Sequence, residues 1–224
     1  MTKPFASEIP NQPAVQGYLH TPQSESTHSL VLTHGAGSNC DTPLLTRVAE
    51  AFSNAGITVL RCDLPFRQLR PHGPPSGNGA QDRAGLRRAV DALGQIAPAR
   101  VFLGGHSYGG RQASMLAAED PNLVDALLLL SYPLHPPNRP EQMRTAHFPK
   151  LEIPVLFVHG SDDPFGSLAE MRAASKLIAS PVELLAIEGA GHDLIRGAHN
   201  VAGQTLAAFL RLVDRAPIAG KARD

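Results

Sequence analysis

Short apolar runs alternate with longer amphipathic segments along most of the chain. Continuous apolar runs are typical of strands that are buried on both faces of a sheet. We therefore expect strands at 15–20, 29–33, 57–62, 100–103, 125–132, 153–158 and 182–187, the first of them at an edge of the sheet. Amphipathic helices are expected between them, at 43–55, 82–96, 112–119, 167–179 and 198–213. This alternation predicts an α/β fold with a mostly parallel central sheet of about six or seven strands and helices on both faces.

The remaining segments are rich in proline and glycine. Residues 1–13 contain three prolines and are expected to form an irregular lead-in. Residues 64–80 are expected to form one long loop, and its length favours a functional role. A single domain is expected over 14–215, followed by a frayed tail at 216–224.

Composition argues against several classes of protein. The 224 residues carry a formal net charge of zero with scattered lysines and arginines, so neither nucleic acid nor a membrane is expected as a partner. No apolar run reaches the roughly 20 residues that a membrane span requires, and the first residues lack the apolar core of a signal peptide. Cys40 and Cys62 belong to no metal-binding or redox motif, so a cytoplasmic location is expected.

The segment 104–110 carries the strongest chemical signal. Its Gly-x-Ser-x-Gly pattern lies between an apolar run and helix-forming residues, so Ser107 is expected on a sharp strand-to-helix turn, a nucleophile elbow. A serine on such a turn has a strained backbone, and Gly105 and Gly109 stand where a Cβ atom would collide. The alternative is an ordinary glycine-rich turn with a surface serine, because short motifs also occur by chance.

Two aspartates and a histidine follow later strands. Asp162 and Asp163 come after the apolar run that ends at Val158, and His192 comes after the last predicted strand. Functional loops of parallel sheets gather at the carboxyl ends of the strands, so these side chains are expected near Ser107. The chain order serine, aspartate, histidine is the order of one well-defined type of catalytic triad.

Four motifs together resemble the α/β-hydrolase superfamily over nearly the whole chain. They are Thr-His-Gly-Ala-Gly at 33–37, Gly-His-Ser-Tyr-Gly-Gly-Arg at 105–111, His-Gly-Ser-Asp-Asp-Pro-Phe-Gly at 159–166 and Gly-Ala-Gly-His at 189–192. Within the superfamily the chain looks like the small, lidless, dienelactone-hydrolase-like group, and most like predicted bacterial hydrolases related to the Tex30 and KANSL3 hydrolase-like proteins. Dienelactone hydrolases use a cysteine nucleophile where this chain has Ser107, so their substrate is not carried over. The resemblance implies no large cap domain, because residues 133–150 are too few to form one.

The resemblance assigns catalytic roles that also follow from chemistry. Ser107 would attack an acyl carbonyl, and His192 would take its proton and later return it to the leaving group. The superfamily's His-Gly-x-x-Asp spacing selects Asp163 as the acid that orients His192, which leaves Asp162 as a solvated turn residue. Asp162 stays open as the other candidate acid, and a simple turn histidine is the alternative for His192.

Two backbone N–H groups are expected to form an oxyanion hole. One belongs to Tyr108, the residue after the nucleophile. The resemblance gives Ala36 as the second donor and Gly37 as its alternative. A purely structural turn is the competing interpretation of this glycine-rich loop.

Structural roles are expected for the other histidines and for Arg111. His34, His106 and His159 end strands and are expected to bond backbone groups. No histidine pair has the spacing of metal ligands, so no metal is expected. Arg111 matches an arginine of the same bacterial branch. We expect it in a buried structural pair rather than in contact with the substrate, because a cation near a helix N-terminus is otherwise unfavourable.

The sequence thus predicts a serine hydrolase that acts on a carboxylic ester or thioester of a small acyl substrate, through an acyl-enzyme and with no cofactor. Acyl transfer or peptidase activity would use the same residues. The alternative from another class is a weakly active or inactive hydrolase-like interaction protein, because a fold does not fix a function. Neither the oligomeric state nor the physiological substrate is indicated.

Overall fold

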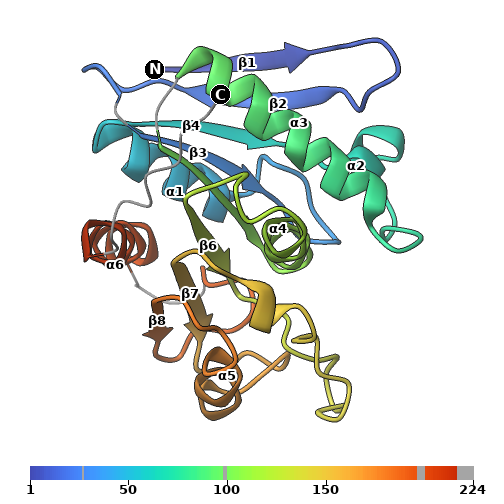
Figure 1. The fold of residues 1–224 in the computed structure, drawn as a ribbon, viewed down its shortest axis with the longest axis vertical. Coiled ribbons are helices and arrows are strands. Elements are labelled where there is room, and N and C mark those ends of the chain that lie inside the picture. The colour runs from blue at the N-terminus through green and yellow to red at the C-terminus, as the bar shows by residue number, and fades with distance from the viewer. Residues whose placement is uncertain (27, 98–99, 196–199, 216–224) are drawn as a thin grey trace.

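A computed structural model describes residues 1–26, 28–97, 100–195 and 200–215. Its centre is an eight-stranded sheet with the strand order β1-β2-β4-β3-β5-β6-β7-β8 (Figure 1). The strands are β1 Thr2–Ser7, β2 Val15–His20, β3 His28–Thr33, β4 Ile57–Cys62, β5 Arg100–His106, β6 Ala126–Leu130, β7 Val155–Gly160 and β8 Val182–Ile187. From β3 to β8 all pairings are parallel, whereas β2 is antiparallel to both β1 and β4.

Helices cover both faces of this sheet. They are α1 Pro43–Asn54, α2 Pro65–Leu69, α3 Ala80–Ile96, α4 Tyr108–Glu119, α5 Leu168–Ser175 and α6 Val201–Arg215, with the 3-10 turn η1 Phe148–Lys150. On one face lie α1 and α6, and on the other lie α3, α4 and α5 (Figure 1). None of the described helices is long and apolar enough to cross a membrane.

Each face of the sheet has its own apolar layer, and β6 shows why the strands are apolar throughout. Leu127 and Leu129 of β6 pack into the layer under α3, α4 and α5. Leu128 and Leu130 point the other way, into the layer under α1 and α6. Successive strand residues face opposite sides, so a strand that is covered on both sides needs an apolar residue at every position.

The N-terminal segment forms a strand that the sequence interpretation missed. β1 pairs with β2 along its whole length, with Pro4 opposite Tyr18, so the expectation of an irregular lead-in over 1–13 is wrong for its first half. β1 lies at the edge of the sheet. A proline is tolerated there because an edge strand need not donate every N–H to a neighbour.

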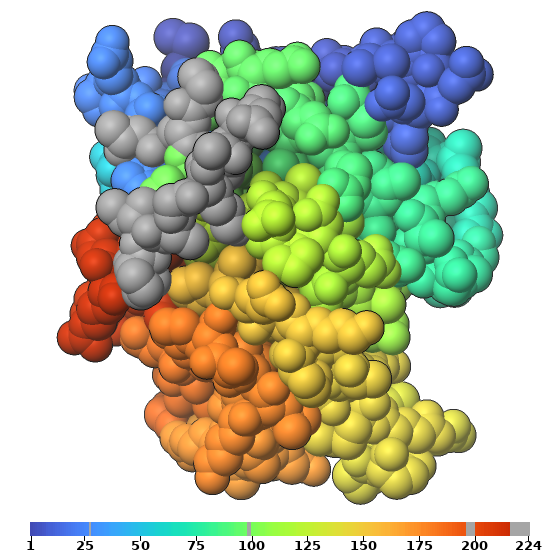
Figure 2. Space-filling model, in the orientation of Figure 1, coloured from blue at the N-terminus to red at the C-terminus, as the bar shows by residue number. Residues whose placement is uncertain are grey.

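The segment 64–80 is not a continuous loop. It contains α2, which begins at Pro65, where the fixed φ angle of proline suits a first helical turn. The segment 133–150 contains only η1, so no cap domain is present in the described part of the chain. Figure 2 shows the outline of the molecule indented between the yellow 133–150 segment and the green-to-cyan surface of α2 and α3.

His20 couples the stability of this fold to pH. Its Nε2 accepts a hydrogen bond from Nε of Arg61 at 2.9 Å, and its Nδ1 lies 3.0 Å from Oγ1 of Thr2. Burial, helped by the charge of Arg61, lowers the pKa of His20 to about 4. The folded protein therefore favours neutral His20. Its contribution to stability is complete above the unfolded pKa of 6.5 and is lost as the pH falls toward 4.

We expect this one group to lower the free energy of unfolding by up to about 3 kcal/mol between pH 6.5 and 4, at about 1.4 kcal/mol per pKa unit. Urea unfolding of the wild type and of His20→Gln at pH 7, 5.5 and 4 measures this, and the variant should lose less stability on acidification. His72→Gln is the control, because His72 is exposed, and it should keep the wild-type pH dependence. The same slope in wild type and His20→Gln would contradict the assignment.

Candidate active site

The parallel strands bring four loops together at the carboxyl ends of the strands. Thr33 of β3 lies opposite Gly105 of β5, and Gly160 of β7 lies opposite Ile187 of β8. The loops that follow these four strands carry the predicted oxyanion-hole residue Ala36, the predicted nucleophile, the two candidate acids and the predicted base.

Ser107 stands on a strained turn between β5 and α4. Its φ and ψ angles are 51° and −116°, and α4 begins at the next residue. A Cβ on Gly105 would lie 2.7 Å from the backbone of Gly109, and a Cβ on Gly109 would lie 2.5 Å from the carbonyl oxygen of His34. Both distances are too short for any side chain. This is the geometry that the Gly-x-Ser-x-Gly pattern predicts.

Three of the predicted side chains form one hydrogen-bonded chain. Nε2 of His192 lies 2.8 Å from Oγ of Ser107. Nδ1 of His192 lies 2.8 Å and 3.0 Å from the two carboxylate oxygens of Asp163. A carboxylate only accepts hydrogen bonds, so Nδ1 carries the proton and Nε2 is left to accept the proton of the serine hydroxyl.

The two candidate acids differ sharply in position. Asp163 is 5% exposed, and Oδ1 also accepts the N–H of Phe165 at 2.9 Å. Asp162 is exposed, and its carboxylate accepts the hydroxyl of Ser161 at 2.9 Å. The structure therefore brings Asp163, and not Asp162, to His192.

Two aromatic rings hold His192 in place. The ring of Phe165 lies 4.3 Å from that of His192, centroid to centroid, at an interplanar angle of 33°. Nε2 of His106 bonds the carbonyl oxygen of His192 at 2.8 Å. Burial lowers the pKa of His106 to about 4, so this imidazole is neutral near pH 7 and acts as a fixed donor. Sequence reasoning missed the role of Phe165, because the residues next to it in the sequence give no sign that its ring packs against His192 on another loop.

The backbone roles expected for the strand-end histidines are confirmed. Nδ1 of His34 bonds the carbonyl oxygen of Gly35 at 2.8 Å, and Nε2 of His159 bonds that of Gly166 at 2.7 Å. Burial lowers the pKa of both histidines. His159 thereby ties the two ends of the loop that presents Asp163. Over the described residues, no group of three or more histidine, cysteine or acidic side chains could hold a metal ion.

The predicted oxyanion donors belong to two segments that lie beside Ser107. Tyr108 is the first residue of α4, where a backbone N–H has no partner within the helix. The loop after β3 also lies against Ser107, since a Cβ on Gly35 would lie 3.4 Å from Cβ of Ser107. Within the described chain, no hydrogen bond engages the N–H of Tyr108 or of Ala36. Both N–H groups can therefore donate to a ligand.

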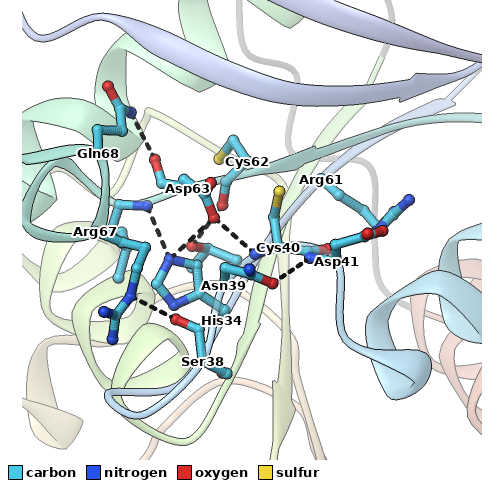
Figure 3. Close-up of polar contacts among 12 residues, drawn as sticks. His34, Ser38, Asn39, Cys40, Asp41, Arg61, Cys62, Asp63, Arg67 and Gln68 are labelled. Carbon is cyan, nitrogen blue, oxygen red and sulfur yellow. Dashed lines mark hydrogen bonds and ion pairs between the residues drawn. The ribbon is translucent and has the colours of Figure 1, made fainter. Parts of the chain in front are cut away.

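A polar network anchors the loop after β3, and sequence reasoning missed it (Figure 3). The guanidinium of Arg67 is the centre of this network and is buried. It donates to the carbonyl oxygens of Ala36 at 2.9 Å and Ser38 at 2.8 Å, and it also bonds those of Arg70, Pro71 and Gly73.

The carboxylate of Asp63 makes a second anchor, because Oδ1 accepts the N–H of Cys40 at 2.7 Å (Figure 3). The same oxygen lies 3.4 Å from Nε2 of His34. That nitrogen accepts the N–H of Leu64 at 3.1 Å, so the imidazole is neutral and makes no ion pair there.

We expect Arg67→Met to lower kcat for the reaction at Ser107 by roughly 10- to 100-fold with little change in KM. An oxyanion-hole donor that is removed outright costs about 100- to 1000-fold, and a donor that is only displaced should cost less. Arg70→Met is the matched control, since Arg70 is an exposed arginine next to the same helix. Steady-state kinetics of both variants, with thermal unfolding to establish that they fold, measure the effect. Equal kcat values for the two variants would exclude a positioning role for Arg67.

Arg111 does not form the ion pair that the sequence interpretation expected. Among the described residues, no carboxylate lies within ion-pair distance of its guanidinium. Nε of Arg111 is buried and has no hydrogen-bond partner. The expectation was wrong because the side chain of Arg111 is only half-buried, so solvent screens its charge from the helix dipole and no internal counter-ion is required.

The fold and these loops are those of the α/β hydrolases, and the chain belongs to this family. A family model described as an alpha/beta hydrolase domain matches residues 26–215. Membership places the protein among the hydrolases.

Solved structures share the fold over nearly the whole chain. A dienelactone hydrolase from Anabaena variabilis is similar at 23% identity, with a TM-score of 0.76 over 95% of this chain and 98% of its own. Est1E from Butyrivibrio proteoclasticus is similar at 18% identity, with a TM-score of 0.76 over 95% and 99% of the two chains. XC6422 from Xanthomonas campestris, described as an α/β serine hydrolase without a lid, is similar at 16% identity, with a TM-score of 0.73 over 94% of each chain.

Proposed function

We propose that the protein hydrolyses a carboxylic ester or thioester through a covalent acyl intermediate on Ser107. The observation that carries this proposal is the hydrogen-bonded chain from Asp163 through His192 to Oγ of Ser107, with distances of 2.8 Å at both links. A free serine hydroxyl is a weak nucleophile at neutral pH, and an adjacent base is what activates it.

In the first half of the reaction, Oγ of Ser107 attacks the acyl carbonyl while Nε2 of His192 takes its proton. The carbonyl oxygen becomes an oxyanion, and the N–H groups of Tyr108 and Ala36 donate to it. When the tetrahedral intermediate collapses, the bond to the leaving group breaks, and His192 returns the proton to the leaving oxygen or sulfur. The product of this half is acyl-Ser107 and a free alcohol or thiol.

In the second half, water takes the place of the leaving group. Nε2 of His192 removes a proton from water as it attacks the acyl carbon, and the collapse of this second intermediate returns the proton to Oγ of Ser107. The free acid leaves and Ser107 is regenerated. Throughout, Asp163 holds the Nδ1 proton of His192 and stabilises the imidazolium, without becoming protonated itself.

An experiment on the acyl intermediate tests this proposal. Hydrolysis of p-nitrophenyl butyrate and phenyl butyrate is measured in the presence of methanol, which competes with water for an acyl-enzyme. The two esters should give the same ratio of methyl butyrate to butyrate, because both pass through the same butyryl-Ser107. A ratio that depends on the leaving group would indicate direct attack by water. The absence of any turnover would favour the interaction-protein alternative.

A further inference from the structure

The side chain of Tyr108 bonds a buried carboxylate that the proposed chemistry does not use. Its hydroxyl donates to Oδ2 of Asp82 at 2.7 Å, across 26 positions of the sequence. Asp82 is 3% exposed, and its Oδ1 accepts the N–H of Phe66 at 3.1 Å. Burial, helped by the bond to Asp82, raises the pKa of Tyr108, so the phenol keeps its proton and remains the donor. A carboxylate of α3 thus holds the residue directly after the proposed nucleophile.

Both hydrogen-bond partners of Asp82 are neutral groups. Among the described residues, no lysine, arginine or histidine side chain lies within ion-pair distance of its carboxylate. Burying a carboxylate without a cation costs free energy. Asp82 stands in the first turn of α3, where a negative charge is favourable, and this offsets part of the cost. The helix position accounts for an acid at residue 82, but it does not account for the bond to Tyr108.

The ring of Phe66 connects Tyr108 to the loop after β3. It lies 5.7 Å from the ring of Tyr108, centroid to centroid, at an interplanar angle of 89°. It also lies 5.6 Å from the ring of His34, and the guanidinium of Arg67 stands 4.9 Å from its centroid. Edge-to-face ring pairs and a cation over a ring are both favourable contacts. One ring therefore contacts both Tyr108 and the polar network that anchors the loop after β3.

Helices α2 and α3 are packed closely together (Figure 1). A Cβ on Gly85 of α3 would lie 2.5 Å from Cγ of Pro65 of α2, so the contact leaves no room for a side chain there. Arg83 ties α3 in turn to α4, because its guanidinium donates to Oε1 of Gln112 and bonds the carboxylate of Glu119, both at 2.9 Å. Contacts that do not involve Tyr108 therefore already fix α2 and α3 beside α4.

The turn at Ser107 needs such support. The peptide group between Ser107 and Tyr108 carries the N–H that is expected to donate to the oxyanion, and its direction depends on ψ of Ser107 and φ of Tyr108. The φ and ψ angles of Ser107 are 51° and −116°, a strained conformation that persists only where the surroundings enforce it. A donor in a catalytic site must also be held to within about 0.5 Å of its productive position. Anchoring the side chain of Tyr108 restricts the backbone at the end of this turn.

We propose that Asp82 is a positioning residue for the oxyanion hole, because it fixes the side chain of Tyr108 to the backbone of Phe66 in α2. This inference rests on the proposed function. Arg67, the next residue of α2, donates to the carbonyl oxygen of Ala36 at 2.9 Å. The two predicted oxyanion donors are thus held by neighbouring residues of one short helix. The segment 64–80, which the sequence marks as functional by its length, acts as their common support.

Inhibition by propyl trifluoromethyl ketone tests the inference. Oγ of Ser107 adds to the ketone carbon, His192 takes the hydroxyl proton, and the carbonyl oxygen becomes an oxyanion, with no leaving group to expel. We expect Tyr108→Phe and Asp82→Ala each to raise the inhibition constant roughly 10-fold, since a displaced donor should cost less than a missing one. The value of kcat for p-nitrophenyl butyrate should fall by a similar factor, with KM within about twofold of the wild type. The double variant should be no more impaired than Asp82→Ala, because both changes remove the same support.

Two further variants separate positioning from stability. Asp82→Asn should stay within about threefold of the wild-type inhibition constant, because an amide can accept the N–H of Phe66 and donate to the phenol oxygen of Tyr108. Arg83→Met is the matched control, since it breaks bonds between α3 and α4 without touching Tyr108. It should lower the free energy of unfolding and leave the inhibition constant unchanged.

The outcomes also separate this inference from the function on which it rests. An unchanged inhibition constant in Tyr108→Phe and Asp82→Ala would overturn the inference and leave the proposed function in place. A lower kcat with an unchanged inhibition constant would mean a smaller active fraction, hence a structural role only, and would overturn it as well. A wild type that turns over no ester and binds no ketone by fluorine NMR would remove the proposed function itself. If Asp82→Ala does not fold, Tyr108→Phe, which deletes a single oxygen, decides by the same criterion.

Discussion

Ser107→Ala and His192→Ala are each expected to lower kcat for p-nitrophenyl butyrate by roughly 10⁴-fold or more, and the double variant should be no slower than either single variant. The reason is that the two residues act as a unit: without the hydroxyl there is nothing for His192 to activate, and without His192 the hydroxyl keeps its proton. Steady-state kinetics of the three variants measure this. Effects that multiply in the double variant would mean that the two residues act separately.

Ser167→Ala is the matched control for the serine variant. Ser167 forms the N-terminal capping box of α5 with Glu170 and lies outside the hydrogen-bonded chain of the site. Its loss should lower the free energy of unfolding by about 1 kcal/mol and leave kcat within about twofold. A loss of activity in Ser167→Ala as large as in Ser107→Ala would show that the assay reports stability and not chemistry.

Asp163→Asn is expected to lower kcat by roughly 10⁴-fold, whereas Asp162→Asn should stay within about twofold of the wild type. An amide at position 163 can donate as well as accept, so it no longer requires the Nδ1–H tautomer of His192. That tautomer is the one that leaves Nε2 free for Ser107. Kinetics of the two variants under the same conditions provide the measurement.

Asp162→Asn is a matched control for Asp163→Asn, because the two aspartates are adjacent in the chain but their carboxylates bond different residues. Asp163 is buried, and its carboxylate bonds His192. Asp162 is exposed, and its carboxylate accepts a hydrogen bond from the hydroxyl of Ser161. Equal losses in the two variants would point to a general disturbance of the loop. A larger loss in Asp162→Asn would transfer the acid role to that residue.

The sheet and the main helices could be predicted from the sequence, because strands covered on both faces must be apolar at every position. β6 is the clearest example, with four consecutive leucines that serve two opposite layers. β1 could not be predicted in the same way. At the edge of the sheet all of its residues are at least partly exposed, and Pro4 interrupts the usual strand pattern.

The candidate site was predictable where one short motif imposes one geometry. Ser107 is such a position, since the turn excludes a Cβ on both neighbouring glycines. Contacts between distant segments leave no local pattern. Arg67 lies 31 positions from Ala36, the carbonyl of which it holds, and Phe165 lies on a different loop from the imidazole against which it packs.

Arg111 shows the opposite error, in which a local rule predicted the wrong partner. The charge near the start of α4 suggested an internal ion pair, but no carboxylate of the described chain lies within ion-pair distance of the side chain. The side chain is half-buried, and solvent screening of a charge cannot be read from the neighbouring residues in the sequence.

The most direct measurement of the proposed chemistry is the intact mass of the protein after treatment with an alkyl fluorophosphonate, followed by peptide mapping. We expect one phosphonyl group per chain, located on Ser107, with labelling slowed by p-nitrophenyl butyrate and absent from Ser107→Ala. A folded wild-type protein that takes up no label, or a label that persists in Ser107→Ala, would contradict the assignment of Ser107 as an activated nucleophile.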